Sequence, residues 1–85
     1  MSKVEVYSKG YCPFCHRAKA LLTQKGIEFI EYEIDVRPEL RDEMITRANG
    51  GHTVPQIFIN DQHIGGCDEM LGLEARNKLD PLLAV

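Results

Sequence analysis

Residues 9–16, KGYCPFCH, place two cysteines three positions apart, between a short apolar run and a run with helical periodicity. Side chains three positions apart on a helix are neighbours, with Cβ atoms roughly 5–6 Å apart. Cys12 and Cys15 can therefore form a disulfide with little backbone movement. Closing so short a loop would stabilise the fold by only about 2 kcal/mol. The spacing therefore favours a redox couple over a structural disulfide.

The cysteine pair is expected at the start of a helix. Pro13 suits the first helical position, because its fixed φ fits there and its missing N–H is not needed. Cys12 then lies near the N-cap, where free N–H groups, the helix dipole and the charge of Lys9 or Arg17 favour a thiolate. An ordinary cysteine is roughly 3% thiolate at pH 7, and cysteines in such motifs have lowered pKa values. We expect Cys12 to be the nucleophile and Cys15 the more covered, less reactive partner.

The cysteine pair has two other interpretations. Two cysteines at this spacing are also half of a zinc site, which needs a second pair of ligands. The remaining candidates form no second C-x-x-C or H-x3–5-H pattern; they are Cys67, His16, His52 and His63. Two purely structural cysteines are the other alternative. We rank both below the redox couple and expect no metal site.

Length and composition predict one small globular domain over residues 1–85. Hydrophobic residues make up 44% of the chain and charged residues 27%, which is typical of a folded protein. With a net charge of −3, the chain lacks the excess of basic residues typical of proteins that bind nucleic acid. It contains no run of about 18 apolar residues, so no membrane span is predicted. The N-terminus has no apolar signal region, so we expect a cytoplasmic protein, where C-x-x-C beside a βαβ pattern indicates redox chemistry.

Hydrophobic periodicity predicts an α/β fold with the order βαβαββα. Apolar alternation indicates four strands, the last two forming a hairpin, at 3–7, 27–34, 56–60 and 62–65. Helical spacing indicates three helices, at 13–25, between the turn at 35–38 and the stop at 49–51, and from an N-cap at Asp68 to a stop at 80–81. The first strand, helix and second strand make a βαβ unit, so these two strands should be parallel.

Three motifs in this order resemble those of the glutaredoxins, small proteins of thioredoxin fold. They are Cys12-Pro13-Phe14-Cys15, Thr53-Val54-Pro55 and Gly65-Gly66-Cys67-Asp68. The resemblance runs nearly end to end and is strongest to the short bacterial dithiol members, although Phe14 stands where the commoner form has tyrosine. It implies a four-stranded mixed sheet with three flanking helices. It also implies a cis Val54–Pro55 bond, against a prior of only about 5–6% for any X–Pro bond.

The resemblance implies a glutathione-dependent disulfide oxidoreductase that reduces protein–glutathione mixed disulfides and protein disulfides. Cys12 would attack and carry glutathione transiently, and glutathione or Cys15 would then release it. Glutathione would be a co-substrate, with no tightly bound cofactor. The implied partners are disulfide-containing or glutathionylated proteins, and we expect a monomer.

The residues implied to bind glutathione suit its two carboxylates, one ammonium and extended backbone. Lys9 can meet one carboxylate, and the start of the third helix, at Cys67 and Asp68, offers N–H donors to the other. The Asp68 carboxylate can meet the ammonium, and Val54, extended because it precedes a proline, can pair with the ligand backbone. The full set, with the two aromatic residues flanking the site, is Lys9, Tyr11, Phe14, Thr53, Val54, Pro55, Gly66, Cys67 and Asp68.

Two alternative functions remain open. An enzyme of the same fold could be served by a thioredoxin-type reductase, although the glutathione-binding motifs argue against it. A dimer could bridge an iron–sulfur cluster through Cys12 and the thiol of glutathione, although Pro13 and the second thiol at Cys15 disfavour this. Taken by itself, Cys67 is best interpreted as a small buried residue near the pocket.

Overall fold

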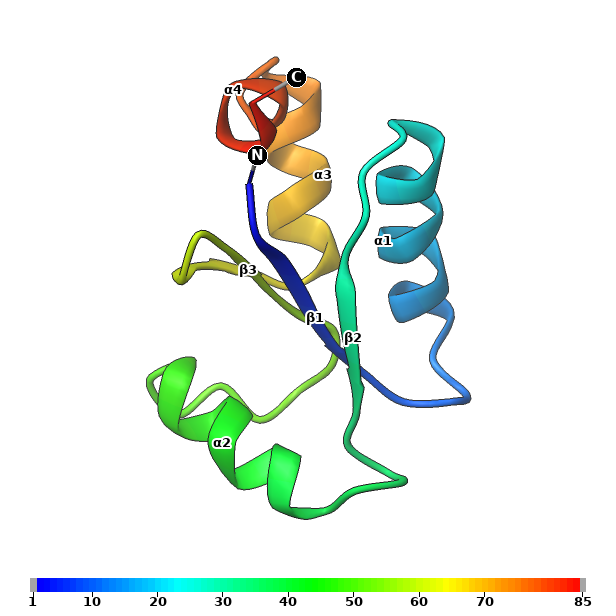
Figure 1. The fold of residues 1–85 in the computed structure, drawn as a ribbon, viewed down its shortest axis with the longest axis vertical. Helices are drawn as coiled ribbons and strands as arrows, with labels where there is room; N and C mark the ends of the chain where they lie inside the picture. The colour runs from blue at the N-terminus through cyan, green and yellow to red at the C-terminus, as the bar shows by residue number, and fades with distance from the viewer. Residues whose placement is uncertain (1, 85) are drawn as a thin grey trace.

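The computed structural model describes residues 2–84, which form a four-stranded mixed sheet (Figure 1). The strands are β1 (Val4–Ser8), β2 (Ile30–Glu33), β3 (Gln56–Ile59) and β4 (Gln62–Gly65). Their order across the sheet is β2-β1-β3-β4. β1 is parallel to β2 and antiparallel to β3, and β3 and β4 form the predicted hairpin. The predicted α/β architecture with a mixed sheet is confirmed.

Helices cover both faces of this sheet. They are α1 (Pro13–Gln24), α2 (Glu39–Arg47), α3 (Cys67–Ala75) and α4 (Leu79–Leu83). α1 and α3 pack beside each other on one face together with α4, and α2 covers the opposite face (Figure 1). Within residues 2–84, every helix is too short or too polar to cross a lipid bilayer.

The two central strands supply side chains to two separate cores. Val4 and Val6 of β1 join the core beneath α1, α3 and α4, whereas Tyr7 joins the core beneath α2. On β3, Ile57 joins the first core and Phe58 the second. Successive side chains of a strand point to opposite faces. Because helices cover both faces, β1 and β3 bury side chains on both sides of the sheet.

The third predicted helix differs from the observed one at both ends. Gly66, not Asp68, is the N-cap, and Asp68 is the second helical residue. The helix ends at Ala75, and Asn77 beyond it adopts a left-handed conformation with a φ of 57°. Pro81 does not end a helix as predicted. It lies in the first turn of α4, where a backbone N–H would have no helical partner, so its missing N–H costs no hydrogen bond. Within residues 2–84, four helices therefore flank the sheet in place of the predicted three.

The second strand is shorter than predicted, because only four of its residues pair with β1. Ile27 instead donates its N–H to the carbonyl oxygen of Leu22 at 3.0 Å, in the turn after α1. Gly26, with a φ of 72°, makes this turn possible. The predicted helix stop at Gly26 is thus confirmed, while the strand begins later than its apolar residues suggested.

A charged network attaches α2 to the sheet. The two terminal nitrogens of Arg47 donate to the carboxylate of Glu5 at 2.9 and 3.1 Å, and one of them also donates to the Tyr7 hydroxyl at 2.9 Å. The Arg47 guanidinium lies 4.1 Å from the ring centroid of Phe58, within the range of a cation–π contact. Hydrogen bonding to Arg47, supported by Tyr32, lowers the pKa of Glu5 although burial opposes this.

We predict that Glu5→Gln weakens the loss of stability in acid. The folded pKa of Glu5 lies below its usual value of 4.5. Its ionised form therefore stabilises the folded state above that value, and this contribution is lost as the pH falls through the lower folded pKa. Urea denaturation from about pH 7 to about pH 3 should show a shallower decline in unfolding free energy for Glu5→Gln than for the wild type. The exposed Glu28→Gln is the matched control, and the same decline in all three proteins would contradict the prediction.

Candidate active site

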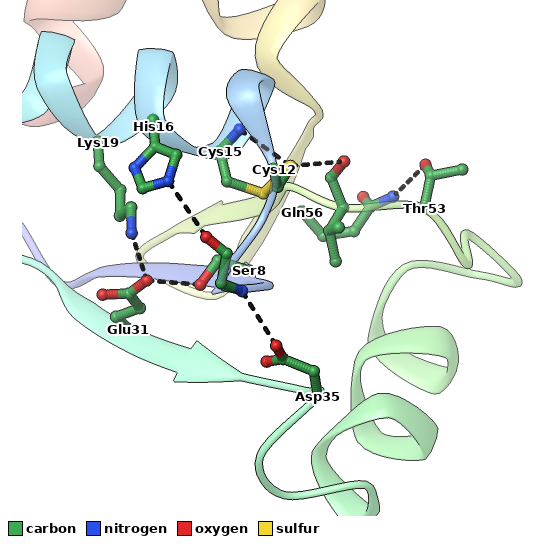
Figure 2. Close-up of a disulfide and its surroundings, with 11 residues drawn as sticks. Ser8, Cys12, Cys15, His16, Lys19, Glu31, Asp35, Thr53 and Gln56 are labelled. Atoms are coloured by element: carbon green, nitrogen blue, oxygen red, sulfur yellow. Dashed lines mark hydrogen bonds and ion pairs between the residues drawn. A yellow bond between two sulfur atoms is a disulfide. The ribbon is translucent and has the colours of Figure 1, made fainter.

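Cys12 and Cys15 form a disulfide at the start of α1, with Cα atoms 5.1 Å apart (Figure 2). Cys12 is the N-cap in an extended conformation, and Pro13 opens the helix as predicted. The backbone N–H of Cys15 donates to the Cys12 sulfur at 3.1 Å. The sulfur thus takes the place of the oxygen that usually caps a helix N-terminus.

The two sulfur atoms differ in their access to solvent. Cys12 is 8% exposed, whereas Cys15 is fully buried. An approaching thiol or disulfide therefore meets Cys12 first. The prediction that Cys15 is the more covered of the pair is confirmed.

The loop before the disulfide is held on both sides of Gly10. The N–H of Gly10 donates to Asp35 Oδ2 at 3.1 Å, and its carbonyl oxygen lies 3.3 Å from His16 Nε2. Asp35 follows β2 and His16 belongs to α1. The exposed loop that carries Lys9 and Tyr11 is therefore attached to two different elements.

A second cluster fixes the end of β1, from which this loop departs. The Ser8 hydroxyl and the Lys19 ammonium both donate to Glu31 Oε2, each at 2.6 Å (Figure 2). Burial disfavours the charged form of Glu31, but the bonds from Lys19 and Ser8 outweigh it and hold the pKa of this carboxyl below its usual value. The cluster joins β1, β2 and α1 at the base of the active-site loop.

A groove of about 170 Å³ adjoins the disulfide. Val54 lines this groove, and its carbonyl oxygen lies 3.8 Å from the Cys12 sulfur. The Val54–Pro55 bond is cis, as the resemblance implied. The lining comes from the start of α1, the loop before β3 and the start of α3; it is Phe14, Thr53, Val54, Pro55, Gly66, Cys67, Asp68 and Glu69. The structure therefore gathers every residue predicted to bind glutathione except Lys9 and Tyr11.

Lys9 and Tyr11 lie outside the groove lining, on the exposed loop before Cys12. Tyr11 is fully exposed, and Phe14, on the other side of Cys12, is half exposed. The guanidinium of Arg17 lies 5.6 Å from the Phe14 ring centroid. Exposed aromatic surface therefore flanks the accessible sulfur on both sides along the chain.

Cys67 is a buried free thiol, 3% exposed, at the first position of α3. Burial raises the pKa of this thiol, and the carboxylates of Asp68 and Glu69 act in the same direction, while Arg17 opposes them. A raised pKa favours the unreactive thiol form at neutral pH. Cys67 is thus the small buried residue that the sequence predicted.

The predicted set omits Glu69, which also lines the groove. Its carboxylate accepts the N–H of Gly66 at 2.6 Å, which is the acidic half of a capping box at the start of α3, because the glycine N-cap has no side chain to supply the other half. The sequence signal for this contact is an acidic residue three positions after a helix N-cap. Gly65, with a φ of 118°, approaches Glu69 so closely that an added Cβ would lie 2.8 Å from its side chain. Gly65 and Gly66 therefore leave room for the Glu69 side chain to reach the Gly66 N–H.

We predict that Glu69→Ala lowers the free energy of unfolding by about 1 kcal/mol, because the Gly66 N–H loses its partner. Glu69→Gln keeps an acceptor oxygen and should lose less. Urea denaturation of the two variants and the wild type measures the difference. Equal stability of Glu69→Ala and the wild type would contradict the capping role.

Comparison with known proteins places this site in a family. Residues 4–64 match the family model for glutaredoxin. The chain is 59% identical over 83 residues to glutaredoxin 3 of Escherichia coli, covering 98% of this chain and 99% of that protein. It is 57% identical over 82 residues to a probable glutaredoxin of Synechocystis sp., covering 96% of this chain and 93% of that one.

Solved structures agree with the sequence comparison. The buckwheat glutaredoxin–glutathione complex matches 98% of this chain and 77% of its own, with a TM-score of 0.89 at 34% identity. A dithiolic glutaredoxin from Trypanosoma brucei brucei matches 96% of this chain and 87% of its own, with a TM-score of 0.86 at 40% identity. The resemblance predicted from the three motifs is confirmed. The chain belongs to the glutaredoxin family, and with its Cys12–Cys15 dithiol it is a glutathione-dependent disulfide oxidoreductase.

Proposed function

We propose that Cys12 is the attacking thiolate of this oxidoreductase and that Cys15 resolves the mixed disulfides it forms with proteins. The observation that carries the proposal is the 3.1 Å hydrogen bond from the Cys15 N–H to the Cys12 sulfur, at the N-cap of a 12-residue helix. In the reduced protein, this N–H and the positive end of the helix dipole favour a thiolate at Cys12. The buried Cys15 lacks the access that an attacking group needs.

With a glutathionylated protein, the Cys12 thiolate attacks the glutathione sulfur of the mixed disulfide. The substrate S–S bond breaks, the protein sulfur leaves as a thiolate that takes up a proton, and glutathione stays attached to Cys12. A glutathione thiolate then attacks the attached glutathione sulfur, which restores the Cys12 thiolate and releases glutathione disulfide. This cycle needs Cys12 alone.

With a protein disulfide, the cycle needs both cysteines. Cys12 attacks one substrate sulfur and forms a mixed disulfide with the protein. Cys15 loses its proton and attacks the Cys12 sulfur, so the substrate leaves as a dithiol and the Cys12–Cys15 disulfide forms. Two glutathione molecules then reduce this disulfide and leave as glutathione disulfide. The Cα separation of 5.1 Å suits the internal bond.

We assign the groove beside Cys12 to glutathione. The backbone of Val54 faces the sulfur that would carry the ligand, so an extended peptide can pair with it there. The first N–H groups of α3, at Cys67 and Asp68, suit one ligand carboxylate. The Asp68 side chain suits the ammonium, and Lys9 suits the other carboxylate. The buckwheat relative that contains glutathione supports this assignment.

The exposed aromatic side chains beside Cys12 are the proposed contact surface for protein substrates. Tyr11 and Phe14 present apolar area on both sides of the reactive sulfur. Cys12, Cys15 and the groove all belong to one chain, so the proposed catalytic unit is a monomer.

We predict that Cys12→Ser abolishes both activities, by a factor of about 10³ or more, because the nucleophile is lost. Cys15→Ser should keep much of the activity on a protein–glutathione mixed disulfide but lose reduction of a protein disulfide. Assays with glutathione and a coupled glutathione reductase measure both rates. Cys67→Ser is the matched control, since Cys67 has no place in the proposed cycle. An active Cys12→Ser protein, or equal losses in both assays for Cys15→Ser, would contradict the proposed roles.

A helix-stabilised thiolate also predicts how the rate of Cys12 alkylation depends on pH. In the Cys15→Ser background, the iodoacetamide rate should reach half its maximum at a pH clearly below the value of about 8.5 expected of an ordinary thiol. Mass spectrometry after short reaction times separates the Cys12 product from the buried Cys67 product. A Cys12 rate that still rises steeply above about pH 8 would rule out the thiolate mechanism.

A separate experiment tests which reductant supplies electrons to this protein. The proposal expects turnover with glutathione and its reductase, and little turnover when a thioredoxin-type reductase is the only reductant. Running the two reducing systems separately, with the same glutathionylated substrate, decides between them. Turnover supported by the thioredoxin-type reductase alone would overturn the assignment of the groove to glutathione.

A further inference from the structure

We propose that Gln56 and His63 are positioning residues that aim the hydroxyl hydrogen of Thr53 into the glutathione groove. The inference rests on the proposed function, because it takes the groove as the glutathione site. Side chains of the β3–β4 hairpin would then contribute to specificity, because they orient a hydroxyl donor toward an acceptor oxygen of the ligand.

The three side chains form a hydrogen-bonded series from β4 to the groove. His63 Nε2 lies 2.6 Å from Gln56 Oε1, and Gln56 Nε2 lies 3.4 Å from Thr53 Oγ1. Figure 2 shows the amide of Gln56 directed at the Thr53 side chain. Gln56 is 5% exposed, so its amide is fixed by the protein, whereas Thr53 is exposed and lines the groove.

The chemical types of these atoms set the direction of the series. A glutamine oxygen only accepts, so His63 Nε2 carries the hydrogen of the first bond. A glutamine nitrogen only donates, so Thr53 Oγ1 accepts in the second bond. The single hydroxyl hydrogen of Thr53 therefore remains to be donated elsewhere. Its partner in the groove would be a carbonyl or carboxylate oxygen, groups that glutathione carries along its whole length.

Neighbouring groups contact both positioning residues, of which Gln56 is buried and His63 is exposed. The His63 ring lies against Phe58 with centroids 5.0 Å apart, which places Nε2 toward Gln56. Gly51 leaves space for the amide, since an added Cβ would lie 3.1 Å from Gln56 Nε2. A donor oriented before the ligand arrives avoids part of the entropy cost of ordering a side chain on binding.

The test compares a glutathione mixed disulfide with a cysteine mixed disulfide of the same protein. Gln56→Leu removes both amide contacts, and His63→Phe keeps the ring on Phe58 but removes the donor. Each should raise KM for the glutathione substrate by about two- to fivefold, the effect of one weakened hydrogen bond. The rate with the cysteine substrate and the Cys12 alkylation rate should stay at the wild-type level. Gln62→Leu, the same change on the exposed neighbour, should leave both substrates at wild-type values.

A double-mutant cycle separates positioning from general support of the fold. Thr53→Val should raise the same KM by about fivefold, and adding Gln56→Leu to it should raise KM no further. Thr53→Ser, which keeps the hydroxyl, should restore wild-type KM. Independent effects of the two changes, or equal losses on both substrates, would overturn the inference.

Failure of the proposed function gives a different result. A wild-type protein without any preference for the glutathione substrate over the cysteine substrate would refute the groove assignment itself. A wild-type preference that survives unchanged in both Gln56→Leu and His63→Phe would overturn only the role of these two residues. If Gln56→Leu lowers the melting temperature, His63→Phe still decides the outcome.

Discussion

The bond from the Cys15 N–H to the Cys12 sulfur is the interaction on which the site depends. Helix N-termini usually use a side-chain oxygen to accept a free N–H, and here a redox-active sulfur does so. α1 therefore has to begin directly after Cys12, and Pro13 at its first position favours this start. The same geometry exposes one sulfur and buries the other. Capping, reactivity and the order of attack thus follow from a single local arrangement.

The rest of the fold holds this helix start beside the groove. Glu31 accepts hydrogen bonds from Ser8 and Lys19, and these bonds hold the end of β1 against β2 and α1. On the other face of the sheet, the Arg47–Glu5 pair attaches α2, which leads into the loop carrying the cis bond. Charged side chains thus anchor both segments that approach the disulfide, while the apolar cores supply most of the burial.

The groove combines three segments with different physical tasks. The loop before β3 offers backbone groups beside the reactive sulfur, and the start of α3 offers N–H groups. Glu69 already occupies the Gly66 N–H, so the ligand would meet the next N–H groups of that helix. Cys67, although it lines the groove, is held in its thiol form by burial. Of the three cysteines, Cys12 is therefore the one whose sulfur is accessible and caps a helix.

The sequence alone determined the order of strands and helices along the chain, the parallel β1–β2 pair, the β3–β4 hairpin and the helix start after Cys12, because these depend on periodicity and on neighbours within a turn. The family resemblance of its motifs supplied most of the groove lining. The order of the strands across the sheet came from the structure. The sequence placed the α3 cap two residues late and missed α4, since Asn77 and Pro81 act through local backbone geometry that periodicity does not resolve. Only the tertiary structure decided the Arg47–Glu5 pair, which joins residues 42 positions apart, and the direction of the His63–Gln56–Thr53 series. Such contacts depend on strand register and side-chain orientation, and these are set when the helices close over the sheet.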